Sequence, residues 1–462
     1  MSSNRYPGRP GVDSSPLGQP LTFPFSGRTA KNRFMKASTT EKMASWHPTD
    51  QSRQGIPGPE LATLYRAWSA GDFGVILTGN MLIDRTNIES PGNTIVPITA
   101  DPSPTSPLFT GLQALAAAGK SHGSLILGQL NHPGRQAVAS IQPDPVSASD
   151  VQLHFDFLGE TFAKPHPASL DEIRDITAAF VHAAVVLDKA GFDGVQLHGA
   201  HGYLLAQFLA ETTNLRTDAY GGSLENRARL ITDIADGIRA QTRPDFILAI
   251  KVNSVEFQAG GLTTEDAAQL CVLLERHTFD FVELSGGTYE ELGFYHRKES
   301  TKKREAFFLE FAEMIAPRLT KTKTYVTGGL KSAGAMVDAL KSVDGVGLAR
   351  VANSEPNLPR DILSGKVAAA IRPVEAIYQD EFALQGGLAA VQMPIVGKGL
   401  QPLDVSDPVA AEAFINGLAG WMKALRHKDG DDVLEHFKVD FLKRVDEGAL
   451  ESVVEAVEEG AR

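Results

Sequence analysis

Short runs of apolar residues recur along the chain, and most are followed by a segment whose apolar positions have helical spacing. Within each run the apolar residues are largely consecutive rather than alternating, which is typical of strands buried on both faces of a parallel sheet. The pattern therefore predicts eight strands joined by helices. They lie at residues 33–37, 75–81, 124–130, 194–197, 247–252, 281–284, 324–327 and 345–349.

The segment between the third and fourth strands carries a complete helical signal. Ser169 and Glu172 have the spacing of a capping box, in which each side chain bonds the backbone N–H of the other residue. Gly191 stands where a left-handed residue would end the helix before the next strand. Between them the apolar positions share one helical face, at Ile173, Ile176, Phe180 and Ala184.

Eight strand–helix units can form an open doubly wound sheet or a closed barrel. No Gly-x-Gly-x-x-Gly follows the first strand, and polar residues stand at the ends of many different strands. In a barrel these ends meet around one pocket, whereas in an open sheet they would spread along an edge. The sequence thus predicts a (β/α)8 TIM barrel with a helical C-terminal extension. The polar strand ends include Thr40, Asn80, Gln129, His198, Lys251, Ser285, Thr327 and Arg350.

Three parts of the chain differ in composition. Residues 1–28 form a lead rich in proline and glycine, in which residues 21–25 are expected to add a small strand at the barrel floor. Residues 29–366 would form the barrel. Residues 367–462 begin with scattered proline and glycine and then become helical, with apolar positions at Val433, Leu434, Phe437, Phe441 and Val445.

Charge and cysteine content narrow the function. The 462 residues carry a net charge of −12, which argues against a wide basic surface for nucleic acid or anionic lipid. Cys271 is the only cysteine, which excludes an internal disulfide, an iron–sulfur cluster and a zinc–thiolate site. The first twenty residues lack the apolar core of a secretory signal, and the most apolar stretch, 178–187, is too short to cross a bilayer. We therefore expect a cytoplasmic protein with no nucleic-acid or membrane partner, and the oligomeric state stays open.

The ends of the last two strands suggest a phosphate site. Gly328 and Gly329 let backbone amides approach a ligand closely, and Arg350 offers a planar cation with several donors. In β/α barrels a phosphate often binds after strands 7 and 8. The alternative is that the glycines only turn the chain and that Arg350 pairs with a carboxylate.

Lys251 and a pair of histidines are the other candidates. Lys251 could form a Schiff base with a carbonyl substrate, neutralise charge on a cofactor, or simply lie at the rim. His198 and His201 have no carboxylate or third histidine at a metal-ligand spacing, so no metal is expected. Two imidazole N–H donors aimed at one oxygen would stabilise an oxyanion, and Tyr203 could deliver a proton.

Four segments together resemble the old yellow enzyme family, the FMN-dependent NADH:flavin oxidoreductases or ene-reductases. They are residues 29–40 (TAKNRFMKASTT), 128–135 (GQLNHPGR), 198–205 (HGAHGYLL) and 214–227 (NLRTDAYGGSLENR), and they occur in family order. The resemblance runs from about residue 21 to residue 366. It implies a TIM barrel that binds FMN, takes hydride from NADH or NADPH, and reduces the double bond of an enone or enal by a ping-pong mechanism.

The resemblance also implies which residues hold the flavin. Thr40 would lie near flavin O4, Gln129 would read the pyrimidine edge, and Lys251 would stand beside N1 and O2, where reduced flavin carries negative charge. Gly79 would lie against the ring. The full set is Ala37, Ser38, Thr39, Thr40, Gly79, Gln129 and Lys251 around the ring, with Gly328, Gly329, Ala349 and Arg350 clamping the phosphate.

His198 and His201 match the family's pair that binds the substrate carbonyl, and Tyr203 matches its proton donor. Ser38 and Thr39 depart from the family, which often has proline or alanine and then methionine at these positions. Other functions stay open at this point: a flavin quinone or nitro-compound reductase, a Schiff-base aldolase using Lys251, or a redox-silent isomerase on the same barrel.

Overall fold

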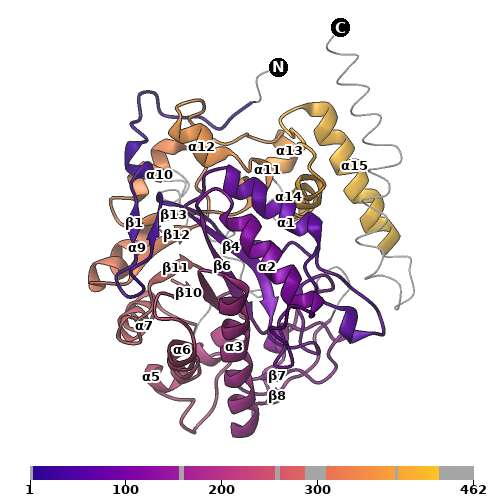
Figure 1. The fold of residues 1–462 in the computed structure, drawn as a ribbon, viewed down its shortest axis with the longest axis vertical. Helices are drawn as coiled ribbons and strands as arrows, with labels where there is room; N and C mark the ends of the chain where they lie inside the picture. Colours follow the sequence, from indigo (N-terminus) through magenta and orange to yellow (C-terminus); the bar gives the residue numbers. More distant parts are fainter. Residues whose placement is uncertain (1–3, 156–160, 255–260, 287–308, 380–382, 426–462) are drawn as a thin grey trace.

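Eight parallel strands close into a barrel at the centre of the molecule (Figure 1). The computed structural model describes residues 4–155, 161–254, 261–286, 309–379 and 383–425. Each barrel strand pairs with the next, and β3 pairs with both β13 and β4 to close the ring. The strands are β3 (Phe34–Lys36), β4 (Val75–Leu82), β6 (Leu125–Asn131), β9 (Gly194–Gly199), β10 (Ile247–Asn253), β11 (Phe281–Ser285), β12 (Lys323–Thr327) and β13 (Gly345–Leu348). The predicted TIM barrel is therefore confirmed.

The inward-facing residues are apolar at the N-terminal ends of the strands. Because alternate residues of a strand point to the same face, Ile247 and Ala249 of β10 both enter the barrel interior. An antiparallel hairpin of β1 (Leu21–Thr22) and β2 (Thr29–Ala30) packs into the same cluster, with the ring centroid of Phe23 5.4 Å from that of Phe281. The interior cluster comprises Leu21, Phe23, Ala30, Met35, Ala37, Val75, Leu77, Leu125, Leu127, Ile247, Ala249, Phe281 and Tyr325.

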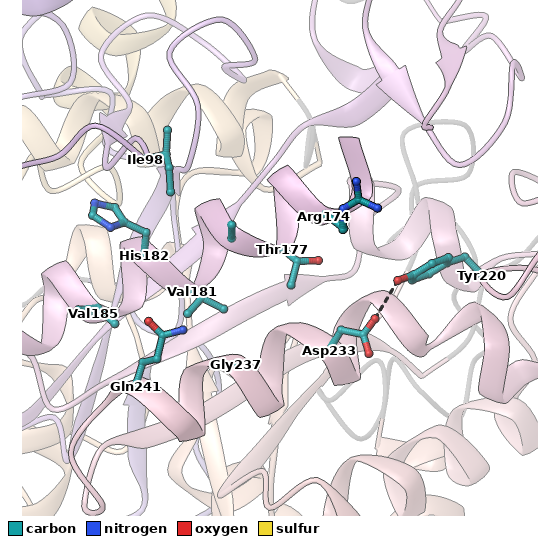
Figure 2. Close-up of a pocket in the computed structure, with 11 residues that line it drawn as sticks. Ile98, Arg174, Thr177, Val181, His182, Val185, Tyr220, Asp233, Gly237 and Gln241 are labelled. Carbon is teal, nitrogen blue, oxygen red and sulfur yellow. Dashed lines mark hydrogen bonds between the residues drawn. The ribbon is translucent and has the colours of Figure 1, made fainter. Parts of the chain in front are cut away.

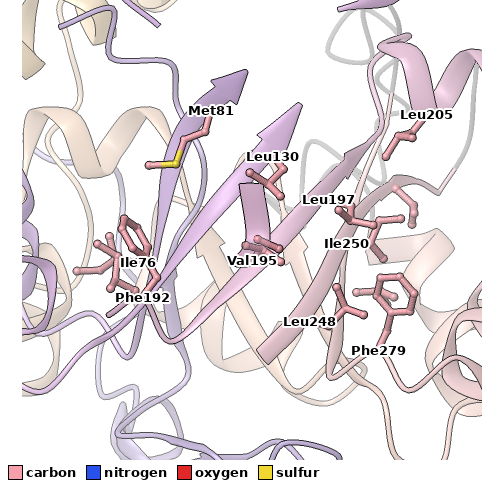
Figure 3. Close-up of a cluster of buried hydrophobic side chains, with 14 of the residues drawn as sticks. Ile76, Met81, Leu130, Phe192, Val195, Leu197, Leu205, Leu248, Ile250 and Phe279 are labelled. Carbon is pink, nitrogen blue, oxygen red and sulfur yellow. The ribbon is translucent and has the colours of Figure 1, made fainter. Parts of the chain in front are cut away.

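Helices cover the outside of the barrel. In α3 both halves of the predicted capping box are formed, and Gly191 ends the helix in the left-handed region at φ 93°. Figure 3 shows outward-facing strand residues such as Ile76, Val195 and Ile250 in the apolar layer between strands and helices. The helices of the barrel region are α1 (Pro59–Ala70), α2 (Pro107–Lys120), α3 (Leu170–Ala190), α4 (Leu204–Leu209), α5 (Leu224–Arg227), α6 (Arg229–Gln241), α7 (Thr264–Arg276), α9 (Leu309–Ile315), α10 (Ala333–Ala339), α11 (Arg350–Ser354) and α12 (Leu358–Leu363).

Several short elements lie in the connections. β5 (Thr94–Ile95) pairs with the end of β4, and β7 (Val146–Ser147) pairs in parallel with β8 (His166–Pro167). The 3-10 turns are η1 (Ser15–Gly18), η2 (Gln51–Arg53), η3 (Gly134–Gln136) and η4 (Ala316–Arg318).

The predicted helical extension contains α13 (Glu375–Gln379), α14 (Ala383–Gly397) and α15 (Pro408–Leu425). Figure 1 shows α14 beside α1, with α15 farther from the barrel. The helical positions predicted between Val433 and Val445 lie outside the described residues. Among the described helices, none combines the length and the apolar character that crossing a bilayer requires.

Lys36 at the end of β3 is a charged residue inside the wall between barrel and helices. Its side chain is fully buried, its Nζ lies 4.0 Å from the ring centroid of Trp68 on α1, and it donates a 2.8 Å hydrogen bond to Thr39 Oγ1. Burial lowers the pKa of Lys36 to about 7, although Glu41 and Glu283 nearby oppose this and Lys251 adds to it. The folded protein is therefore less stable when Lys36 is charged than when Lys36 is neutral.

This position gives a pH-dependent prediction for the variant Lys36→Met. In the unfolded chain the lysine titrates at its ordinary pKa near 10.5. Between pH 7 and about 10 the unfolded state therefore binds more protons, and wild-type stability gains up to about 1.4 kcal/mol per pH unit relative to the variant. Below pH 7 Lys36 is protonated in both the folded and the unfolded state, so the difference in unfolding free energy between wild type and variant is constant.

Urea unfolding of wild type and variant across this range measures the difference directly, because groups common to both proteins cancel. We expect the gain in unfolding free energy of Lys36→Met over wild type to be largest at pH 6 to 7 and to shrink as pH rises. A difference that stays flat up to pH 10 would mean that burial does not depress the pKa of Lys36.

Candidate functional site

Near the C-terminal ends of the strands, the inward-facing side chains change from apolar to polar. Along a strand, the last apolar residue that faces inward is followed two residues later by a polar one. The polar residues form a group of buried side chains directly above the apolar interior. We name this group the polar layer. It consists of Gln129 on β6, Gln196 on β9, Lys251 on β10 and Glu283 on β11.

The polar layer is one continuous chain of contacts that begins in the segment after β3. Ser38 Oγ donates to Gln129 Oε1 at 2.8 Å, and Gln129 Nε2 donates to Gln196 Oε1 at 2.7 Å. Gln196 Nε2 then donates to Glu283 Oε2 at 2.9 Å, and Lys251 Nζ lies 3.3 Å from Glu283 Oε1. Strand register brings these partners together, because Gln129 pairs with Gln196 and Lys251 with Glu283 in the parallel ladders. The chain therefore ends in a buried ion pair.

Two members of the polar layer, Glu283 and Gln196, were not predicted from the sequence. The carboxylate of Glu283 is fully buried, and its Oε1 accepts no hydrogen bond from the described residues beyond its contact with the Lys251 ammonium. A signal was present in the sequence, because Glu283 stands two residues after Phe281 on the same strand and so must share its inward direction. The ammonium of Lys251, the cation predicted from the sequence, thus has the Glu283 carboxylate beside it, which partly compensates its positive charge.

The structure brings the predicted histidine pair together. His198 Nε2 lies 3.1 Å from His201 Nδ1, His198 Nδ1 lies 3.0 Å from Asn80 Oδ1, and His201 Nε2 lies 2.9 Å from Ser285 Oγ. Burial lowers the pKa of both imidazoles well below the ordinary value, and the Lys251 ammonium acts in the same direction. Both rings are therefore neutral at neutral pH.

Neutral rings fix where the hydrogens lie. Asn80 Oδ1 can only accept, so His198 Nδ1 carries its hydrogen and His198 Nε2 must accept from His201 Nδ1. His201 Nε2 then accepts from the hydroxyl of Ser285. The sequence expectation was two N–H donors aimed at one oxygen, whereas here all four ring nitrogens are engaged. A carbonyl oxygen must therefore displace the contact between the two rings to bind them.

Tyr203 lies against this pair at the start of α4. Its ring centroid is 4.6 Å from that of His198, and the side chain is buried. His201 adopts a left-handed backbone with φ 59°, and its N–H donates to Asn253 Oδ1 at 3.2 Å. This turn carries the chain from the end of β9 back over the barrel mouth, which places both rings and the phenol together.

The segment that follows β3 contains the other predicted ring contacts. Ala37 belongs to the barrel interior, and Thr40 Oγ1 accepts a 3.3 Å hydrogen bond from Asn80 Nδ2, which joins this segment to the histidines. Gly79 was expected to be small so that it could lie against a flavin ring. The structure gives a second reason, because a Cβ there would lie 2.1 Å from Glu41 Oε2, and Gly79 N donates to Glu41 Oε1 at 2.8 Å.

The predicted phosphate clamp lies at the ends of β12 and β13, which are neighbours in the barrel. Gly328 and Gly329 both have positive φ, at 136° and 77°, which other residues adopt rarely and which turns the backbone over the mouth. Ala349 and Arg350 follow β13 directly. Thr327 Oγ1 is buried and has no hydrogen-bond partner among the described residues.

The residues at the barrel mouth fit FMN, the cofactor expected from the sequence. A row of amides ending in a lysine suits the pyrimidine edge of the ring, and two left-handed glycines beside an arginine suit a phosphate. The unpartnered hydroxyl of Thr327 between these regions is the kind of group that a bound cofactor satisfies. The buried side-chain amide of Asn131, at the end of β6, has both its oxygen and its nitrogen without a partner among the described residues and was not predicted.

A separate groove lies on the outside of the molecule between α3 and α6. It has a volume of about 500 Å³ and includes Val181, His182 and a hydrogen bond of 3.0 Å between Tyr220 and Asp233 (Figure 2). None of the predicted site residues lines it. Among the described residues, the predicted site residues lie at the barrel mouth instead.

Comparison with known proteins adds an independent observation. The profile of the NADH:flavin oxidoreductase / NADH oxidase family matches residues 16–368. The chain is 49% identical over 419 residues to the NADH-dependent flavin oxidoreductase nadA of Aspergillus parasiticus, a match that covers 89% of this chain and 92% of that protein.

Two solved structures are similar to this fold. Morphinone reductase in complex with tetrahydroNAD superposes with a TM-score of 0.62 at 25% identity, covering 77% of this chain and 93% of that one. A 2-naphthoyl-CoA reductase in complex with 2-naphthoyl-CoA gives a TM-score of 0.70 at 21% identity, covering 86% of this chain and 59% of that longer one. The second likeness bears on the fold alone.

Proposed function

This chain belongs to the NADH:flavin oxidoreductase / NADH oxidase family, and on that basis we propose that it is an ene-reductase that uses FMN and NADH or NADPH to reduce the C=C bond of α,β-unsaturated carbonyl compounds. One observation carries the proposal. A neutral histidine pair, a tyrosine and an ion-paired lysine meet at one barrel mouth, although they come from the ends of two strands, β9 and β10, and from the turn after β9.

The cofactor would lie across this mouth. The polar layer would hold its pyrimidine edge, the segment 37–40 would line its ring, and Arg350 with the two glycines would hold its phosphate. Bound FMN supplies the hydride at its N5 atom, which the nicotinamide replenishes. The ion pair with Glu283 argues against a Schiff base at Lys251, because an ammonium held by a carboxylate has no free electron pair with which to attack a carbonyl.

His198 and His201 would bind the substrate carbonyl oxygen. As neutral rings they do not repel the positively charged lysine nearby, and the N–H of His201 Nδ1 can turn from His198 to this oxygen and stabilise the charge that develops on it. Asn80 and Ser285 hold the outer nitrogens of the pair. His198 Nε2 would donate as well only after its hydrogen moves from Nδ1 and the Asn80 amide turns to donate there.

Tyr203 would protonate the α-carbon. Its ring packs on His198, so a substrate held by the histidines lies within reach of the phenol. Because nicotinamide and enone would use the same mouth in turn, the mechanism would be ping-pong. A quinone or nitro-compound reductase is the alternative, and it would not depend on this proton.

Replacement of Tyr203 by phenylalanine separates these functions. Reduction of the flavin by NADH needs no proton from Tyr203, so its rate should stay close to wild type. Reoxidation by a cyclic enone should slow by roughly 10²–10⁴-fold, the usual contribution of a positioned general acid. Stopped-flow absorbance of the flavin measures each half-reaction.

Tyr220→Phe is the matched control, because it removes a tyrosine hydroxyl that bonds Asp233 in the outer groove. A quinone should reoxidise both variants at the wild-type rate, since its oxygens take protons from water. Enone reoxidation that is unaffected in Tyr203→Phe would remove the tyrosine from the mechanism and favour the quinone reductase.

The ion pair predicts opposite shifts of the flavin potential for its two members. Glu283→Gln removes a negative charge near the site where reduced flavin is negative, so the midpoint potential should rise, and Lys251→Met should lower it. Each shift should be some tens of millivolts, since about 30 mV corresponds to 1.4 kcal/mol for a two-electron couple. Equilibration with a reference dye measures both. Shifts of the same sign would place the ring elsewhere.

A further inference from the structure

Helix α14 of the C-terminal extension has two buried faces. Leu388, Val391 and Ile395 pack within the extension, in a small core shared with α13 and α15. Met393 and Val396 instead belong to the main core of the barrel and its helices. A helix that is apolar on both sides is one that lies between two packed layers. The extension is thus joined to the barrel by side chains as well as by the chain itself.

The contact between α14 and the barrel is close. A Cβ at Gly397 would lie 2.6 Å from Met43 Cε and 2.9 Å from the backbone oxygen of Glu60, so this glycine permits the approach to α1. The helix also packs along α11, which begins at the predicted phosphate ligand Arg350. Gln392, next to Met393, joins α14 to the segment that follows it, because its side chain bonds both the N–H and the C=O of Leu403 at 2.8 Å.

The thioether of Met393 reaches the segment predicted to line the flavin. Its Sδ lies 3.6 Å from Thr39 Oγ1, which also accepts from Lys36 Nζ at 2.8 Å and lies 3.3 Å from Asn353 Oδ1. Met393 and Asn353 are both almost completely buried. We name these four residues the Thr39 junction.

The Thr39 junction joins three segments that are distant in sequence. Thr39 belongs to the segment 37–40, Asn353 lies three residues after Arg350 on α11, and Met393 comes from the extension. Lys36 is in turn held over the ring of Trp68 on α1. Since Thr39 has a single hydrogen to donate, Asn353 and Met393 share it, and the positions of all three segments depend on one another.

We propose that α14 is part of the cofactor site: through Met393 it positions the segment 37–40 and helix α11 so that they hold FMN. The inference rests on the proposed placement of FMN across the barrel mouth. Truncation of Met393 would leave a cavity beneath Thr39, and the cavity would let the segment 37–40 move. FMN would then have to order this segment on binding, which weakens affinity.

The test compares two truncations on the same helix. Met393→Ala removes the side chain that contacts the junction, and Leu388→Ala removes a buried side chain of similar size from the opposite face. The dissociation constant of FMN is measured by flavin fluorescence on apoprotein, together with the thermal unfolding of the same apoprotein. We expect Met393→Ala to weaken FMN binding about tenfold, equivalent to about 1.4 kcal/mol, and Leu388→Ala to leave it near wild type.

Met393→Leu keeps the volume of the side chain and should restore most of the affinity and the visible circular dichroism of the bound flavin. If Met393→Ala does not fold, Thr39→Val takes its place, because it keeps the shape of the residue but removes the shared hydroxyl, and it should weaken FMN binding too.

Equal effects of Met393→Ala and Leu388→Ala on FMN binding would show that the extension acts only through overall stability, and they would overturn the proposal. So would FMN binding that is unchanged in Met393→Ala or, in its absence, in Thr39→Val. Wild-type apoprotein that does not bind FMN would instead contradict the proposed function itself, and the two failures are therefore distinguishable.

Discussion

The site depends on a change of polarity along the inside of the barrel. On β6, β10 and β11 an apolar side chain faces the interior and, two residues later, a polar one faces the mouth. On β10 and β11 this single step separates Ala249 from Lys251 and Phe281 from Glu283. Because the strands are parallel and in fixed register, the polar positions of neighbouring strands meet and bond each other. A shift of one residue in any strand would turn its polar group into the apolar wall.

Burial then determines the charge of the two histidines at the mouth. The histidines are held neutral because they are withdrawn from water and lie near a lysine, while that lysine keeps a carboxylate partner at 3.3 Å. A buried ion pair is a weak source of stability, since desolvation of both charges opposes their attraction. Its value under the proposed function is electrostatic, because Glu283 would temper the positive charge that Lys251 offers to the flavin ring. In the proposed mechanism, two neutral imidazoles would face the carbonyl oxygen beside this cation.

Much of this architecture could be predicted from the sequence. Consecutive apolar runs gave the eight strands, and polar residues at strand ends indicated one shared mouth. What could not be predicted was pairing across the barrel. Asn80 and Ser285 hold the histidines from two other strands, and only the three-dimensional register shows that the two rings bond each other. Met393 is the extreme case, because nothing near position 393 indicates that its sulfur lies beside Thr39, more than three hundred residues earlier. Such contacts depend on how the extension folds back, which local periodicity does not encode.

In the proposed function, one barrel mouth passes electrons from a nicotinamide to an activated C=C bond. The most direct test is the visible absorbance of the purified protein under anaerobic conditions, first alone, then with NADH or NADPH, and then with a cyclic enone. The account predicts a flavin spectrum that the nicotinamide bleaches and that the enone restores as the saturated ketone forms. A protein without flavin, or a bleached flavin that an enone leaves unchanged while a quinone restores its colour, would contradict it.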